Sequence, residues 1–430
     1  MASTYLTRTP SSSGNRKTWT LSMWVKRSND NYSQLSGTGT GSTYFIIGFG
    51  DTQPRILQSA NAGEAVSVQI NNKCRDVNGY YHLVFRVDTT QATASNRIRM
   101  YINGEEGTYS ETDYPSQNLD MYYNYNIVHG IGARGDGDSK FDGAMSHIHF
   151  CDGYSYDASS FGSTDSTTGE WKINTDPSVS YGTNGFTILK DGNTVTDQST
   201  NSNNWTVAAG TLTKTEDCPS NIFATMNPLV PTSSLNFSNG NTTLTGTNAT
   251  NYSSNNTSTL GASSGKYYFE IEYDTAGSNT SPSVGISLIS IFPTTNPTGS
   301  VSDLVVITME NQIYVEGTNS ASYLGSTPST GDIIQIALDM DNGKVFFGLN
   351  GTFVGDPVAG SGSAFSGITS GETIALNIRP LNAVFKCNFG NGYFGTTAVS
   401  SAGTNASNNG IFEYDVPTGY TALSTKGLNL

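Results

Sequence analysis

The chain has 430 residues, a formal net charge of −14 at pH 7 and 13% charged residues, about half the usual share of roughly 25%. Its 23 Tyr, 19 Phe and 4 Trp argue against intrinsic disorder, which is poor in aromatic residues. An acidic chain without a stripe of Lys or Arg matches a phosphate backbone poorly, so we expect no nucleic-acid partner. The longest apolar runs are far shorter than the roughly 20 residues of a membrane-spanning helix, which predicts no membrane insertion.

The cysteines are widely spaced and lack the close pairs of a zinc site: Cys74, Cys151, Cys218 and Cys387. The first 19 residues are polar and basic, without the apolar segment of a signal peptide. We therefore expect reduced thiols that pack as small apolar side chains.

Strand patterns dominate residues 1–155. Residues 19–25 alternate, and their apolar positions share one face: Trp19, Leu21, Met23 and Val25. The dipeptide Asn103-Gly104 suits the positive φ angles of a tight hairpin. Further strands are expected at residues 44–48, 65–70, 80–87, 97–102 and 145–150.

A second block of strand patterns fills residues 227–430. Its clearest strand covers residues 267–273, with Phe269, Ile271 and Tyr273 turned inward. The Ser-, Thr-, Asn- and Gly-rich stretch 232–265 is expected to form short edge strands with long loops rather than a flexible linker. Other strands are expected at residues 284–288, 304–309, 312–315, 333–339, 344–349 and 384–389.

Residues 156–226, between the two blocks, contain loops and short apolar pieces, which predicts a mostly irregular connector. No stretch shows the spacing of an amphipathic helix. The sequence therefore predicts an all-β chain of two antiparallel sandwich (jelly-roll) domains, residues 1–155 and 227–430, joined by this connector.

Both blocks resemble known domains. The first resembles the laminin-G/concanavalin-A-like sandwich in residues 19–25 (WTLSMWV), 81–87 (YHLVFRV), 99–104 (RMYING) and 141–150 (FDGAMSHIHF). The second resembles a SPRY-type sandwich in residues 265–270 (GKYYFE), 331–341 (GDIIQIALDMD), 344–350 (KVFFGLN) and 388–390 (NFG).

The whole arrangement is similar to a group of tailed-phage structural proteins, the tail-fibre or lectin-like group. The similarity lies in residues 4–19 (TYLTRTPSSSGNRKTW), the middle stretch 161–186, and residues 218–229 (CPSNIFATMNPL). The resemblance implies a virion protein displayed on the particle exterior, in contact with other capsid or tail proteins. We also expect it to form a homo-oligomer.

Three carboxylates share one face of the strand at residues 267–273 and just beyond: Glu270, Glu272 and Asp274. Their Cα atoms are about 6.6–6.8 Å apart along an extended strand. A retaining glycosidase needs its two carboxyl groups about 5–5.5 Å apart, so such a face is one route to sugar hydrolysis. A solvated outer face is the interpretation that we prefer, and we expect no enzyme.

Asp136, Asp138 and Asp142 form a candidate calcium loop, because calcium prefers clustered oxygens on a flexible loop. An Asp- and Gly-rich turn without metal is the interpretation that we prefer, and no other cofactor is expected. His147 and His149 share a strand face at a spacing that suits a metal, but we prefer an ordinary strand face for them too.

Tyr122, Tyr123 and Tyr125 cluster in the segment MYYNYN. Exposed tyrosine rings stack on the C–H faces of sugars, so these residues are the candidate ligand-binding group. Packing in edge strands or inside the sandwich is the interpretation that we prefer.

The leading functional hypothesis is a non-enzymatic phage surface protein that binds host surface polysaccharide, as a tail fibre or receptor-binding protein does. The first alternative is a capsid decoration (cement) protein bound to the head shell. The second alternative is a polysaccharide-degrading enzyme that uses Glu270 and Glu272.

Overall fold

The structure is a computed structural model that describes residues 3–190, 192, 194–230, 234–248, 254–277, 281–291 and 300–429. Within these residues it consists of strands and four one-turn 3-10 helices: η1 (Ala60–Ala62), η2 (Ala94–Asn96), η3 (Ala158–Ser160) and η4 (Gly427–Asn429). This confirms the expected all-β fold. No helix in the described part is long and apolar enough to cross a membrane.

The chain divides into two compact units, Met1–Lys214 and Thr215–Leu430. The division falls inside the expected connector, residues 156–226. Most of that stretch therefore belongs to the first unit, where it contributes strands to both sheets.

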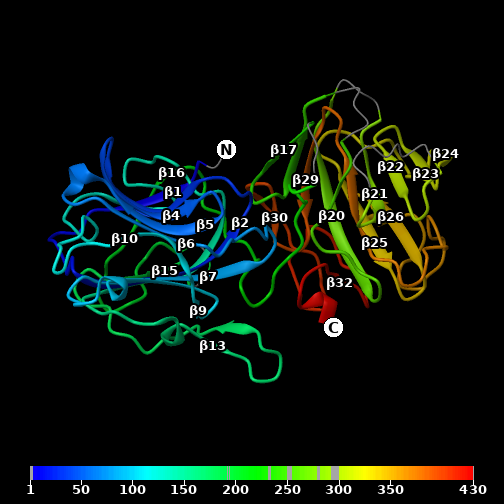
Figure 1. Ribbon diagram of the computed structural model, residues 1–430. Coiled ribbons are helices and arrows are strands. Elements are labelled where there is room, and N and C mark those ends of the chain that lie inside the picture. The colour runs from blue at the N-terminus through cyan, green and yellow to red at the C-terminus, as the bar shows by residue number, and fades with distance from the viewer. Residues whose placement is uncertain are drawn as a thin grey trace. The chain divides into compact units, whose positions relative to one another are not determined.

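The first unit is a sandwich of two antiparallel sheets, drawn one above the other in Figure 1. The eight-stranded sheet follows the order β10 (Tyr109–Asp113), β6 (Val66–Ile70), β5 (Gln53–Gln58), β4 (Thr43–Gly50), β3 (Ser33–Thr40), β11 (His129–Ile131), β1 (Tyr5–Arg8), β16 (Thr206–Ala209). The six-stranded sheet follows the order β15 (Phe186–Ile188), β12 (Gly143–Asp152), β2 (Thr18–Arg27), β7 (Tyr80–Asp88), β8 (Ile98–Ile102), β9 (Glu105–Glu106). A separate pair joins β13 (Gly162–Thr164) and β14 (Trp171–Ile173).

Alternation along the strands builds the core of this sandwich. The four expected apolar positions of β2 are fully buried: Trp19, Leu21, Met23 and Val25. They share a core with Phe45, Ile47 and Phe49 of β4 in the other sheet. Asn103 and Gly104 adopt φ angles of 49° and 87°, as the predicted hairpin between β8 and β9 requires.

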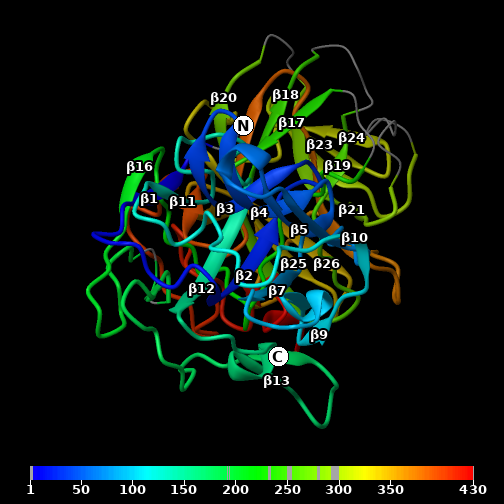
Figure 2. The ribbon, with the colours of Figure 1, turned by 60° about the vertical axis from the view of Figure 1, so that its left-hand side comes forward.

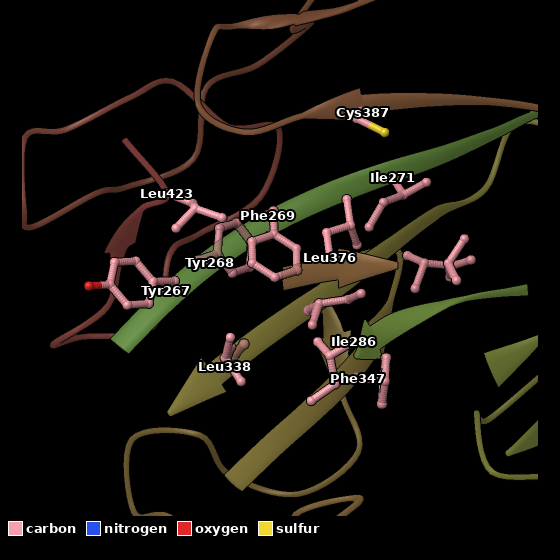
Figure 3. Close-up of a cluster of buried hydrophobic side chains, with 14 of the residues drawn as sticks. Tyr267, Tyr268, Phe269, Ile271, Ile286, Leu338, Phe347, Leu376, Cys387 and Leu423 are labelled. Atoms are coloured by element: carbon pink, nitrogen blue, oxygen red, sulfur yellow. The ribbon is translucent and has the colours of Figure 1, made fainter. Parts of the chain in front are cut away.

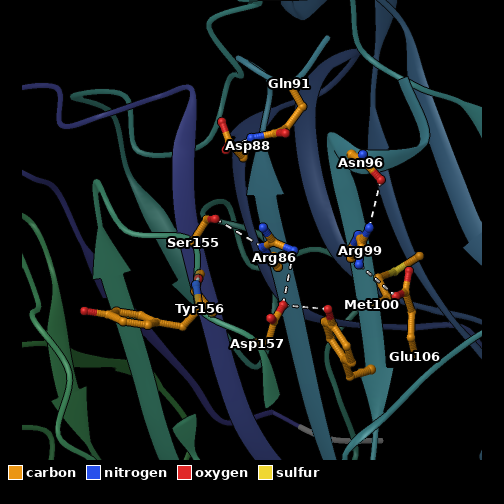
Figure 4. Close-up of polar contacts among 12 residues, drawn as sticks. Arg86, Asp88, Gln91, Asn96, Arg99, Met100, Glu106, Ser155, Tyr156 and Asp157 are labelled. Carbon is orange, nitrogen blue, oxygen red and sulfur yellow. Dashed lines mark hydrogen bonds and ion pairs between the residues drawn. The ribbon is translucent and has the colours of Figure 1, made fainter. Parts of the chain in front are cut away.

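The outer face of the six-stranded sheet is also covered. Residues 153–185, here called the strap, lie beyond this sheet on the side away from the eight-stranded one (Figures 1 and 2). Arg86 of β7 donates to Ser155 at 3.1 Å and to Asp157 at 3.1 Å, and Tyr101 donates to Asp157 at 2.7 Å (Figure 4). A second apolar cluster fills the space beneath the strap: Val84, Tyr101, Cys151, Ala158 and Phe161.

Two buried histidines anchor the strap. His82 accepts a hydrogen bond at Nδ1 from Trp171 Nε1 at 3.0 Å, so its Nε2 carries the proton and donates to Ser22 at 2.9 Å. His149 Nδ1 lies 2.8 Å from the Tyr181 hydroxyl. Burial lowers the pKa of each ring to about 3. Both rings are therefore neutral when the strap is in place.

The second unit is another sandwich of two sheets. One follows the order β17 (Leu235–Ser238), β18 (Thr243–Gly246), β29 (Val384–Asn388), β20 (Lys266–Thr275), β25 (Ile333–Asp339), β26 (Lys344–Leu349), β27 (Thr352–Phe353), with β32 (Thr421–Ala422) parallel to β20. The other follows the order β19 (Asn256–Thr257), β28 (Ile374–Arg379), β21 (Ser283–Leu288), β22 (Val305–Thr308), β23 (Gln312–Val315), β24 (Thr318–Ala321). A short pair joins β30 (Tyr393–Phe394) and β31 (Thr397–Ala398). The stretch 232–265 supplies the edge strands β17 and β19, as expected, although residues 232, 233 and 249–253 lie outside the described residues.

Aromatic and aliphatic side chains fill the space between these sheets. Phe269 of β20 is fully buried, and Figure 3 shows its ring beside Leu376 of β28. Ile271 and Tyr273 are buried as predicted. The free thiol of Cys387 is packed in the same core, as a small apolar side chain would be.

The opposite face of β20 is partly buried, in contrast to the solvated face that the sequence predicts: Tyr268 and Glu270 are buried, whereas Glu272 and Asp274 stay partly exposed. Glu270 has no exposed surface. Its Oε1 accepts from Tyr268 Oη and Tyr414 N at 2.9 Å each, and its Oε2 accepts from Glu413 N at 2.9 Å and Asn388 Nδ2 at 3.2 Å. Burial raises the pKa of Glu270 to about 7, while the four donors favour its charged form. The carboxylate therefore ties the C-terminal segment to the sheet.

Acid should loosen the strap of the first unit. The stability that the neutral histidines contribute is complete above the ordinary pKa of 6.5 and is lost as the pH falls from 6.5 towards 3, by up to about 1.4 kcal/mol per pH unit for each ring. His82→Gln removes one titrating ring, so the variant should be less stable at pH 7 but less sensitive to pH between 6.5 and 5. All Trp residues lie in the first unit, so urea unfolding followed by Trp fluorescence measures this unit alone. An unchanged pH slope in the variant would contradict the role of His82.

Glu270→Gln should destabilise the second unit by about 2–4 kcal/mol, because the new amide donor faces groups that are themselves donors. Glu272→Gln is the matched control: Glu272 is 21% exposed and pairs with Lys386 at 3.5 Å, and Lys386 also pairs with Asp274. We expect the control to cost less than about 1 kcal/mol. Calorimetry of both variants measures the difference, and equal costs would show that the four-donor arrangement is unimportant.

Candidate functional site

The eight-stranded sheet of the first unit has an outer face that the sandwich core does not fill. On β4, Phe45, Ile47 and Phe49 point into the core. Because successive side chains alternate, Ile46 and Gly48 lie on the outer face. This face carries the strongest candidate for a binding site.

Five residues form one line across this face, here called the transverse row. Cross-strand pairing joins Gln34 of β3 to Gly48 of β4, Gly48 to Arg55 of β5, Arg55 to Gln69 of β6, and Gln69 to Glu111 of β10. Neighbouring strands lie about 4.8 Å apart, so the Cα atoms of Gln34 and Arg55 are about 10 Å apart on either side of Gly48. The row therefore places a polar side chain on each side of Gly48, which has no side chain.

Glycine is required at Gly48 on this face, and Gly50 lets two side chains pack closely over it. A Cβ atom on Gly48 would lie 2.3 Å from the carbonyl oxygen of Ser33, which no side chain tolerates. A Cβ atom on Gly50 would lie 2.5 Å from Gln69 Oε1 and 3.1 Å from Arg55 Cδ. The side chains of Arg55 and Gln69 therefore lie close over the bare backbone of Gly50.

Two groups of the row have unused hydrogen-bonding capacity. Gln34 is 2% exposed, and its Oε1 is buried with no protein partner, whereas its Nε2 lies 3.5 Å from the Tyr32 hydroxyl. Arg55 Nε is also buried with no protein partner. A buried polar atom without a partner costs about 1–3 kcal/mol. Gln34 is closed to a ligand by its burial, whereas part of the Arg55 side chain is exposed.

Tyrosine rings and cations border the row. Tyr32 is 41% exposed, and its ring centroid lies 5.9 Å from Arg55 Cζ. The Tyr44 ring lies 5.4 Å from Arg134 Cζ. The face thus combines an exposed tyrosine ring with partly exposed guanidinium donors, which are groups that a polar ring-shaped ligand uses.

The candidate calcium residues are engaged with protein groups. Asp136 accepts two hydrogen bonds from Arg134, at 2.8 and 2.6 Å, and Asp138 pairs with the same guanidinium at 3.5 Å. The bonds from Arg134 lower the pKa of Asp136. Asp142 is held elsewhere: it accepts from Asn29 at 3.3 Å, and burial raises its pKa. In the described part of the chain, no three His, Cys, Asp or Glu side chains gather where they could hold a metal ion, and these three do not either.

Of the three candidate tyrosines, one lies in the core and two lie nearer the surface. Tyr123 is 2% exposed, and its hydroxyl lies 2.8 Å from Ser36 Oγ, so its ring belongs to the core and is closed to a ligand. Tyr122 is half-buried and lies 5.9 Å from the ring of Tyr125. Tyr125 is 39% exposed, but Arg16 Cζ lies 4.7 Å from its ring centroid. Only Tyr125 offers a large exposed surface, and Arg16 lies over its ring.

Sequence reasoning missed the transverse row. The strand that carries Arg55 reads QPRILQ, and Pro54 and Leu57 disturb its alternation of polar and apolar residues. Gln69 lies on a predicted strand, but its neighbours in the row are revealed only by cross-strand pairing.

Three solved structures are similar to part of the chain. The SPRY domain of human HERC1 is 19% identical with a TM-score of 0.26, and the match covers 34% of this chain and 87% of that chain. Stonustoxin is 16% identical with a TM-score of 0.30, and the match covers 40% of this chain and 27% of that chain. The PSpry domain of TRIM65 is 12% identical with a TM-score of 0.28, and the match covers 38% of this chain and 91% of that chain. No curated protein matches the sequence.

Two family models match separate parts of the chain. Residues 2–155 match the concanavalin A-like lectin/glucanases superfamily, and residues 266–390 match the SPRY domain. These ranges agree with the two blocks in which the sequence resembles the same domains. The chain therefore carries a concanavalin A-like domain followed by a SPRY domain.

Proposed function

We propose that the chain is a non-enzymatic binding protein on the exterior of a phage virion, and that the outer face of its eight-stranded sheet holds a host surface glycan. The observation that carries the proposal is the transverse row, in which Gln34 and Arg55 flank the bare backbone of Gly48 beside the exposed ring of Tyr32. The lectin-like and SPRY domains fit a binding or structural role.

A sugar ring has the chemistry that this face accepts. Its C–H face stacks on an aromatic ring such as Tyr32, which keeps 41% of its surface exposed. Arg55, whose side chain is partly exposed, donates to a sugar oxygen.

The non-enzymatic part of the proposal is supported by the state of the strand carboxylates. Both oxygens of Glu270 are occupied by four protein donors. Glu272 and Asp274 both pair with Lys386. None of the three is presented as a free acid or nucleophile.

The proposal that the protein belongs to a phage virion rests on the resemblance of residues 161–186 and 218–229 to tailed-phage structural proteins. Contact with other virion proteins and homo-oligomer formation belong to the same proposal. Cryo-electron microscopy of intact virions tests it. Density on the tail or its fibres would agree with host attachment, density repeating over the head lattice would favour a decoration protein, and absence from the particle would overturn the proposal.

Tyr32→Ala should weaken binding of the full-length protein to an array of bacterial surface polysaccharides about tenfold, because the stacking surface is lost. Tyr154→Ala is the matched control, since Tyr154 is 42% exposed in the same unit but stacks on Tyr156. Its binding should be unchanged. Tyr125→Ala tests the loop tyrosines instead. If this variant alone loses binding, the site lies at the loop tyrosines and not at the transverse row.

A further inference from the structure

Tyr32, the exposed aromatic residue of the candidate site, lies on the short loop between β2 and β3, residues 28–32, here called the Tyr32 loop. Its hydroxyl lies 3.5 Å from Gln34 Nε2, at the outer limit of a hydrogen bond, so this contact fixes the ring weakly. A ring that stacks on a ligand binds more tightly when the loop that carries it is already ordered, because ordering costs entropy. The groups that hold the Tyr32 loop therefore bear on binding.

Arg27, the last residue of β2, holds this loop from inside the sandwich. The side chain is 2% exposed, and its Cζ lies 4.1 Å from the centroid of the Phe49 ring. Its guanidinium donates to three backbone carbonyl oxygens: Asn31 at 2.8 Å, Asp51 at 2.7 Å and Cys74 at 3.0 Å. A planar guanidinium carries several N–H donors in fixed directions, so one side chain can bind all three.

The three carbonyl oxygens belong to three separate segments of the eight-stranded sheet. Asn31 lies on the Tyr32 loop, Asp51 lies in the turn between β4 and β5, and Cys74 lies in the segment that follows β6. Cys74 N also donates to Thr52 O at 2.8 Å, which joins the second and third segments directly. Arg27 itself comes from the six-stranded sheet. It therefore ties one sheet to the loops of the other at the end where Tyr32 lies.

We infer that Arg27 is a positioning residue for the candidate site: it fixes the Tyr32 loop before a ligand arrives, so that the ring is in place when a sugar stacks on it. Arg27 is buried and does not touch the ligand. The inference rests on the proposed function for its ligand, whereas the order of the loop is measured without one.

Arg27→Lys keeps the charge but leaves a single nitrogen, which cannot bind all three segments. In the free full-length variant, hydrogen–deuterium exchange of residues 28–32, measured by mass spectrometry, should be at least about fivefold faster. Its affinity for the polysaccharide that binds the unaltered protein best in the array should fall about fivefold, because binding must then order the loop.

Arg97→Lys is the matched control. Arg97 O accepts from Asp88 N, and Asp88 pairs with Thr18 at the other end of β2 from Arg27. Its guanidinium also donates to three carbonyl oxygens: Gln91 at 2.9 Å, Ala92 at 2.8 Å and Pro115 at 2.8 Å. This variant loses the same kind of contact, yet exchange of the Tyr32 loop and the affinity should change less than about twofold.

A double-variant cycle separates positioning from a general loss of structure. In a Tyr32→Ala background, Arg27→Lys should cause no further loss of affinity, because the ring on which it acts is absent. An equal loss with and without Tyr32, or unchanged exchange of residues 28–32, overturns the inference and leaves glycan binding intact.

Two further outcomes are decided without a ligand or a variant. Binding to no polysaccharide of the array overturns the proposed function, and exchange of the Tyr32 loop in the two variants then decides the role of Arg27. Urea unfolding followed by Trp fluorescence shows whether each variant is folded. If Arg27→Lys is not, the unaltered protein is the test: residues 28–32 should exchange at least about tenfold more slowly than in an unfolded chain, and exchange at the unfolded rate overturns the inference.

Discussion

Every strand turns alternate side chains to opposite sides, so each sheet of a sandwich has a second face that the shared core does not cover. These second faces are covered to different extents. In the first unit the strap covers the six-stranded sheet, and the buried ring of His82 joins Trp171 to the sheet. In the second unit the C-terminal segment covers β20 and is held by Glu270. The eight-stranded sheet keeps an aromatic residue exposed, and there the candidate site lies.

Covering a second face places polar groups in the interior, and each needs partners. Glu270 has four donors, and His82 uses both ring nitrogens. On the outer face of the eight-stranded sheet, Gln34 Oε1 and Arg55 Nε have no protein partner, and buried atoms elsewhere share this state, among them Trp19 Nε1, Trp205 Nε1 and Ser283 Oγ. Unmet hydrogen-bonding capacity therefore does not single out the candidate site, which rests instead on the exposed ring of Tyr32 beside the partly exposed Arg55.

Much of the fold could be predicted because alternation and turn chemistry are local signals. The strand at residues 19–25 and the Asn103-Gly104 hairpin both form as expected. Other strands have no such signal: β3 reads SQLSGTGT, too rich in small residues, and β28 reads IALNIR, with Asn377 buried within it. The site could not be predicted for a related reason, since its residues come from separate strands and meet only through pairing. Tyr123 and Tyr125 stand two residues apart in the sequence, yet the first is buried and the second is exposed, a difference that sequence spacing does not show.

Gly48 has a consequence for how this face can change during evolution. Since any larger residue would collide with the Ser33 carbonyl, the floor of the candidate site is fixed by the backbone and not by a choice of side chain. Relatives that keep this strand pairing must keep glycine at this position. Under the proposed function, ligand preference then changes through the exposed and partly exposed residues nearby, Tyr32 and Arg55, while the strand backbone stays the same.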